Sequence, residues 1–117
     1  MTKRERQNAW VKLQRKRVPL ERSVEAACCA ALEVLGYWAV KVGTDGWPDR
    51  LILLGNGHHI WFEFKRRKFG SLTPAQRRRI PQMIEAGEKV FVIKSAHDGA
   101  VAAASWDAWF RAARRIA

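Results

Sequence analysis

The chain has 117 residues, of which 48% are hydrophobic, so it can form one domain with a modest core. Its 22 Lys and Arg residues outnumber 11 Asp and Glu residues, which gives a net charge of +11 at pH 7. This excess favours a polyanionic partner, nucleic acid before an anionic membrane surface. No segment has the apolar length of a membrane span or of a secretory signal, so we expect no membrane association.

Residues 1–19 are polar and strongly basic, and Pro19 separates them from the rest of the chain. We interpret them as an N-terminal extension, either a helix or a loose arm, ahead of a domain that covers residues 20–117. From Leu20 to Leu35, apolar residues recur at helical spacing and form one stripe, which predicts a helix that ends at Gly36. The stripe comprises Val24, Ala27, Cys28, Ala31, Leu32 and Leu35.

Cys28 and Cys29 are adjacent in the sequence. Neighbouring cysteines argue against an ordinary disulfide framework and indicate small residues packed within a helix. We therefore expect a reducing compartment, the cytoplasm.

Strands are predicted for residues 37–42, 49–54 and 59–65. A turn-rich loop of residues 43–48 joins the first two, and Gly55-Asn56-Gly57 is a strong hairpin signal between the second and third. Residues 89–94 form a fourth predicted strand.

Two further helices complete the pattern. Thr73 can cap a helix that has Pro74 in its first position and runs to about Ala86, although Pro81 could kink or end it. The Ala-rich residues after position 94 are predicted to be helical. The element order, α-β-β-β-α-β-α, predicts an α/β domain with a mixed sheet flanked by helices.

The third strand carries a pattern with chemical meaning. Alternation places Glu63 and Lys65 on one face, together with His59 and Trp61. A carboxylate can hold a metal ion there, and the neighbouring ammonium can orient or help to deprotonate an attacking water.

The hairpin brings a second carboxylate to the same place. If the loop is Gly55 to Gly57, paired residue numbers sum to 112, and Asp49 lies opposite Glu63 with Cβ atoms about 4.5–5.5 Å apart. Two like charges that close repel each other, and Lys65 offsets only part of that repulsion. A divalent cation offsets more, and oxygen ligands suit Mg²⁺ or Mn²⁺. A loop of two residues would shift this register.

Two helices can add polar groups. Glu25 lies at the edge of the apolar stripe and is our choice for a third carboxylate that reaches the metal through a water, with Glu21, one turn earlier, in reserve. Gln76, in the first turn of the helix after Thr73, could hydrogen-bond to Lys65, to the water or to a phosphate.

Each motif alone has an ordinary structural explanation. A Pro-Asp pair is usually turn chemistry, and a lone Glu-x-Lys is usually a surface ion pair. Together, in compatible register within a basic chain, they favour a metal site.

Other polar and aromatic residues have simpler interpretations. We expect His58 and His59 to be solvated rather than metal ligands, and Trp106 and Trp109 to make core or dimer contacts. Arg77–Arg79 fits a solvated helix face and a phosphate-binding surface equally well.

These motifs resemble the VRR-NUC family of PD-(D/E)xK nucleases, which have a restriction-endonuclease-like fold, and in particular its short stand-alone members in phages and bacteria. The resemblance is carried by Gly46–Leu54, Trp61–Lys65 and Leu72–Gln76 within a region from about Glu21 to about Lys94.

The resemblance implies a set of roles. Asp49, Glu63 and the backbone carbonyl of Phe64 correspond to metal ligands for Mg²⁺ or Mn²⁺, Lys65 to the catalytic lysine, and Gln76 to the family's glutamine. It also implies a homodimeric, structure-selective DNA endonuclease that acts on branched or junction DNA in a bacterial or phage-infected cell. The glutamate of the first helix is the loosest match, because Glu21 and Glu25 both fit.

Two alternatives remain. One is a non-catalytic nucleic-acid-binding module that uses only the basic surface. The other is a structural phage or nucleoid protein whose Glu-x-Lys is an ion pair, an idea supported mainly by the basic residues 1–17.

Overall fold

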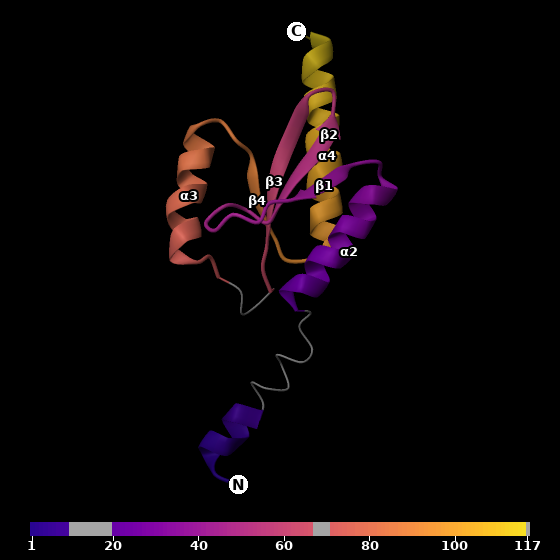
Figure 1. Ribbon diagram of the computed structural model, residues 1–117. Helices are drawn as coiled ribbons and strands as arrows, with labels where there is room; N and C mark the ends of the chain where they lie inside the picture. Colours follow the sequence, from indigo (N-terminus) through magenta and orange to yellow (C-terminus); the bar gives the residue numbers. More distant parts are fainter. Residues whose placement is uncertain (10–19, 67–70, 117) are drawn as a thin grey trace.

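The computed structural model describes residues 1–9, 20–66 and 71–116 (Figure 1). Residues 3–9 form a short helix whose side chains are exposed. The rest of the predicted basic extension, residues 10–19, lies outside the described residues.

Four strands form one mixed sheet in the order β1-β2-β3-β4. They are β1 (Trp38–Lys41), β2 (Arg50–Gly55), β3 (His58–Phe64) and β4 (Val90–Ile93). Neighbouring strands are antiparallel from β1 to β3, and β4 is parallel to β3. The parallel pair requires a crossover, which the helix between β3 and β4 supplies.

Three helices flank the sheet, α2 (Glu21–Val34), α3 (Pro74–Glu85) and α4 (Ala96–Ile116). Figure 1 shows α2 and α4 together on one side of the sheet and α3 on the other. The predicted order and the predicted α/β class are therefore both confirmed. Among the described residues, no helix combines the length and the hydropathy that crossing a bilayer requires.

Helix α2 packs on the sheet through the apolar stripe, in which Val24, Cys28 and Leu32 are buried. The helix ends just before Leu35, and Gly36 comes next with a φ of 87°. Leu35 was expected to belong to the helix and to its apolar stripe, but it lies outside the helix. As the C-cap residue it lies past the last helical turn, and its side chain is 48% exposed.

Helix α3 begins as the sequence predicts. Thr73 is its N-cap, Pro74 is its first residue, and a capping box joins Thr73 to Gln76. Pro81 does not end the helix. Gln76, Ile80 and Met83 form a buried face that extends to both sides of the proline, and this packing holds the helix together there.

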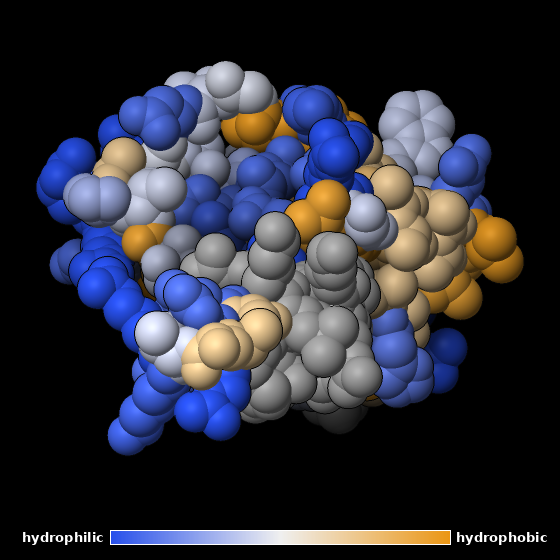
Figure 2. Space-filling model, turned by 90° about the horizontal axis from the view of Figure 1, so that it is seen from below, coloured by the Kyte–Doolittle hydropathy of each residue, from blue (hydrophilic) through white to orange (hydrophobic). Residues whose placement is uncertain are grey.

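The hydrophobic core lies between the sheet and the α2–α4 layer, around Ile52, Ile60, Phe62 and Phe64. Seen from below, the surface is strongly hydrophilic on the side of α3 and more hydrophobic on the side of α2 (Figure 2). The two sides of the sheet therefore carry different surfaces.

Gly99 allows α4 to approach the core closely. A Cβ atom added there would overlap the Sγ atom of Cys28 and come within 3.3 Å of side-chain carbons of Ile93 and Phe62. Cys28 is completely buried and free. The Cys28 side chain therefore occupies the space that a side chain at position 99 would need.

We predict that Gly99→Ala destabilises the fold. Overpacking costs roughly 1–3 kcal/mol, more than the gain of about 1 kcal/mol that alanine brings to a helix. Cys28→Ala should relieve the overlap, so the double variant should be more stable than additivity of the single changes allows. Urea unfolding of the four proteins measures this coupling. Strict additivity would contradict the proposed contact.

Candidate active site

The predicted hairpin register is confirmed. Arg50 pairs with Phe62, and Leu53 pairs with His59, so paired numbers sum to 112 along β2 and β3. The predicted three-residue loop was wrong, because Gly55 pairs with His58 and leaves the two-residue turn Asn56-Gly57; a bulge between Leu53 and Gly55 restores the sum of 112 further along the strands. Gly55, Asn56 and Gly57 all have positive φ. Asp49 immediately precedes Arg50, so the same register carries it to the position opposite Glu63.

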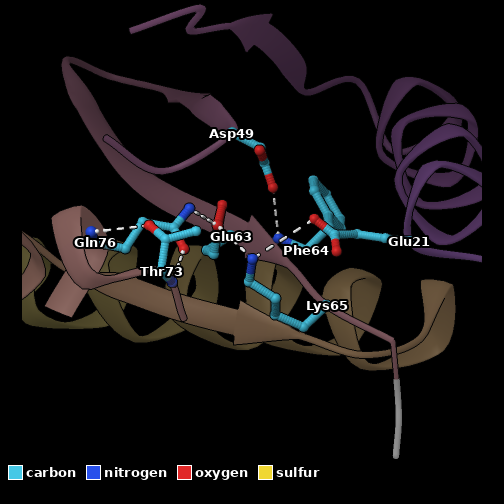
Figure 3. A network of polar contacts seen from close by, with 7 residues as sticks. All are labelled: Glu21, Asp49, Glu63, Phe64, Lys65, Thr73 and Gln76. Atoms are coloured by element: carbon cyan, nitrogen blue, oxygen red, sulfur yellow. Dashed lines mark hydrogen bonds and ion pairs between the residues drawn. The ribbon is translucent and has the colours of Figure 1, made fainter. Parts of the chain in front are cut away.

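The side chain of Asp49 turns towards the end of β3. Its Oδ2 atom accepts a hydrogen bond of 2.8 Å from the backbone N–H of Phe64 (Figure 3). Pro48, directly before it, is fully buried and fixes the entry to β2. The carboxylate is thus held by the backbone of β3, and the main chain of Asp49 is fixed by the proline before it.

Glu63 is completely buried at the centre of this cluster. Its Oε2 atom accepts a hydrogen bond from Nε2 of Gln76, and the Nζ atom of Lys65 lies 3.6 Å from the same oxygen. The Oε1 atom receives no hydrogen bond from any of the described residues. A buried carboxylate oxygen without a donor is costly, and it is also available as a ligand.

The pKa of Glu63 reflects this environment. Burial raises it from 4.5 to about 8, and the adjacent Asp49 adds to the rise, because it can accept a hydrogen bond from the protonated Glu63 carboxyl and repels the ionised one. Lys65 acts in the opposite direction, and Glu21 adds a further small repulsion. Without a cation, Glu63 therefore binds a proton in the range where it would otherwise be ionised.

Gln76 lies at the third position of α3, and the capping box fixes its amide. Its Oε1 atom accepts a hydrogen bond of 3.0 Å from the backbone N–H of Thr73, which leaves its NH₂ group directed at Glu63. The sequence suggested Lys65, a water or a phosphate as partner. In the structure the partner is the carboxylate itself.

The structure places the two glutamates of α2 in the reverse of the expected order of closeness to Lys65. Glu25, the preferred candidate, forms an ion pair of 2.8 Å with Arg50. Glu21, the reserve, has its Oε1 atom 3.7 Å from Nζ of Lys65 and is drawn on the site side in Figure 3. Arg50 also donates to the carbonyl of Ala39, so it binds Glu25 to β1 and β2 rather than to the site.

The expectation that both hairpin histidines are solvated was wrong for His58, which is 8% exposed. Its Nε2 atom lies 3.0 Å from Oδ1 of Asp107, and its ring stacks on Phe110. His59 is half-buried and lies 2.8 Å from a carboxylate oxygen of Glu88. No sequence signal placed Asp107 beside the hairpin.

The two C-terminal tryptophans differ in burial. Trp106 packs against the core, whereas Trp109 is 59% exposed and stacks on Trp106 with ring centroids 4.9 Å apart. The core contact predicted for Trp106 is therefore present.

We predict that Glu63 makes stability depend on pH in a buffer free of divalent ions. Between about pH 4.5 and 8 the folded chain holds a proton that the unfolded chain has lost, so the free energy of unfolding falls as the pH rises through this range. At about 1.4 kcal/mol per pKa unit, the fall is on the order of 1–4 kcal/mol.

Glu63→Gln should remove most of this dependence and be more stable than the wild type at pH 8. Urea unfolding at several pH values measures it. Glu33→Gln, which changes an exposed carboxyl on α2, is the matched control and should follow the wild type. An unchanged pH slope in Glu63→Gln would rule out the proposed origin.

Comparison with known proteins supports the fold. No protein-family model and no curated protein matches the chain. A solved structure described as a VRR_NUC domain matches at 28% sequence identity with a TM-score of 0.61, over 68% of this chain and 88% of its own. The resemblance predicted from the motifs is thus confirmed in three dimensions. The chain is therefore similar to a VRR_NUC domain, and its four-stranded mixed sheet flanked by helices is consistent with a restriction-endonuclease-like fold.

Proposed function

We propose that this protein is a metal-dependent nuclease that hydrolyses phosphodiester bonds in DNA. The likeness to a VRR_NUC domain supports a nuclease acting on nucleic acid. The observation that carries the proposal is the buried Glu63, whose Oε1 atom has no donor among the described residues and whose neighbour is a second carboxylate, Asp49. A divalent cation would satisfy both carboxylates at once.

The donor set fits Mg²⁺ or Mn²⁺. In the part of the chain that the structure describes, no group of three or more His, Cys, Asp or Glu side chains could hold a metal. By the resemblance to VRR-NUC proteins, the protein's ligands would be Asp49, Glu63 and the backbone carbonyl of Phe64. Mg²⁺ suits such a site, because it commonly keeps several waters and uses one or two carboxylates with substrate phosphates. When bound, such an ion stabilises charge on phosphoryl oxygens and lowers the pKa of a water.

Lys65 is placed to handle the attacking water. Its side chain is 8% exposed, and its Nζ atom lies 3.6 Å from Glu63 and 3.7 Å from Glu21. These two contacts hold the amino group of Lys65 at the edge of the site. From there it can orient a water towards a phosphorus atom and stabilise the negative charge that develops.

The other groups act as positioning residues. Gln76 holds one oxygen of Glu63 and leaves the other free, while the backbone N–H of Phe64 fixes Asp49. Glu21 aligns Lys65 from the start of α2. Their effect is to hold the reactive groups before substrate arrives, so that little reorganisation remains.

The finer features of the proposal come from the resemblance and from the surface. Branched or junction DNA as substrate and a homodimer are proposed by likeness to stand-alone VRR-NUC proteins. Exposed hydrophobic side chains at the α2–β1 corner support a protein contact there; they are Val34, Leu35, Trp38 and Val40. A cytoplasmic location fits the two free cysteines, Cys28 and Cys29.

We predict that Asp49→Ala and Lys65→Ala each lower Mn²⁺-dependent cleavage of branched, flapped or nicked DNA by at least about 100-fold. Asp49→Ala removes a ligand, and Lys65→Ala removes the group that orients water. Cleavage is followed on labelled DNA under single-turnover conditions. Undiminished cutting by both variants would remove the proposed site.

Thermal melting provides an independent measurement. Mn²⁺ should raise the melting temperature of the wild type and leave that of Glu63→Gln unchanged. A protein that binds DNA without responding to Mn²⁺ in either assay would instead be a non-catalytic binding module.

We also predict that the two glutamates of α2 differ in function. Glu21→Gln should reduce cleavage about 10-fold, because Lys65 loses an aligning partner, and should alter the pH profile of cleavage. Glu25→Gln should retain cleavage and cost roughly 1 kcal/mol of stability through loss of the Arg50 pair. Cleavage and urea unfolding of both variants test this. The opposite assignment of effects would restore Glu25 to the site.

A further inference from the structure

A polar pocket of about 300 Å³ lies between α3 and the loop that precedes β2. It is lined by Asp45, Gly46, Ala75, Arg78, Arg79 and Gln82. None of these residues belongs to the cluster around Glu63. The pocket contains two of the three arginines of the Arg77–Arg79 run, for which the sequence favoured no function.

The spacing on α3 explains which arginines line the pocket. Ala75, Arg78, Arg79 and Gln82 recur at i, i+3, i+4 and i+7 and therefore share one face of the helix. This face adjoins the buried one. Arg77 lies outside the set that lines the pocket, although it carries the same charge and is also exposed.

The loop and the helix are packed together, so the pocket is a built feature. Gly46 is buried with a φ of 82°, and a Cβ atom added there would lie 3.3 Å from that of Ala75. Arg79 is held above the ring of Trp47 at 5.2 Å, and its guanidinium donates to Gln82 at 3.1 Å. Trp47 in turn packs on Trp61 of β3, with centroids 5.7 Å apart.

Arg78 is the group that is available for a ligand. Among the described residues it makes no ion pair, and its side chain is exposed at the pocket. Asp45 is the one carboxylate in the lining and offsets part of the positive charge of the two arginines. The balance still favours an anion.

The pocket is next to the candidate active site along both of the segments that form it. Gln76, which contacts Glu63, is in the same turn of α3 as Ala75, and Trp47 is two residues before Asp49. In Figure 2 this side of the molecule is the hydrophilic one. A DNA strand that places one phosphate at the carboxylates would therefore run past α3.

We infer that this pocket binds a phosphate of the DNA backbone, on the same strand as the phosphate that is cleaved and next to it. Arg78 is the direct contact, and Arg79, held by Trp47, is the second. The inference rests on the proposed function and deepens it. Guanidinium groups suit this task because they bind phosphate oxygens through paired donors. Contacts of this kind position the strand without reading its sequence.

The test measures binding of a fluorescein-labelled DNA duplex by fluorescence anisotropy in EDTA at several salt concentrations. Arg78→Gln should weaken binding about tenfold and reduce the slope of log K against log salt by about 0.9, as expected for one phosphate contact. Arg77→Gln, one residue away with the same change of charge, should weaken binding less and leave the slope near that of the wild type. Melting temperatures should be unchanged in both variants.

A change of opposite sign sharpens the experiment. Asp45→Asn removes the opposing charge from the pocket and should tighten binding roughly two- to fivefold. Equal effects of Arg77→Gln and Arg78→Gln, or weaker binding by Asp45→Asn, would overturn the proposed pocket. Because binding is measured without metal, this result is independent of whether the protein cleaves. Conversely, Mn²⁺-dependent cleavage by the wild type would still support the proposed nuclease activity if the binding measurements contradicted the phosphate pocket.

Discussion

Two carboxylates that meet where β2 begins and β3 ends place the strongest constraint on this molecule. Glu63 is completely buried and Asp49 is partly buried beside it, and the pKa of Glu63 rises because of this burial and, after it, because of Asp49. The surrounding groups offset only part of the repulsion between the two carboxylates, because Gln76 is neutral and Lys65 carries a single charge. A fold that keeps such a carboxylate pair buried therefore creates a site that binds a proton or a cation.

The hairpin that carries the pair is held at its other end by a second polar network. Asp107 of α4 accepts hydrogen bonds from Tyr37 at 2.8 Å and Arg111 at 3.1 Å and lies 3.0 Å from His58. Burial alone would raise the pKa of Asp107, but the hydrogen bonds from Tyr37, His58 and Arg111 lower it below its ordinary value. The turn end of the hairpin is thus fixed by the polar contacts of Asp107, and the opposite end carries the candidate site residues Asp49 and Glu63.

Local physics explains the features that were predicted correctly from the sequence. The Gly55-Asn56-Gly57 turn accepts positive φ at each position, and strict alternation in β3 permits only one register that buries its phenylalanines. The opposition of Asp49 and Glu63 results from these two facts together with the bulge between Leu53 and Gly55, which returns the pairing to the sum of 112. The capping box of α3 is equally local, because it joins residues three apart in the chain.

The arrangement of helices around the sheet decided the rest. Periodicity shows which face of α2 is apolar, but the angle at which the helix lies on the sheet determines that Glu21 reaches Lys65 while Glu25 meets Arg50. The pairing of Gln76 with Glu63 likewise joins two elements whose separation no spacing rule specifies. The sequence by itself therefore determined the strand register and the paired carboxylates, since both depend on neighbours along one hairpin. Only the tertiary structure decided which helix side chains complete the site, because helix docking depends on packing across the whole core.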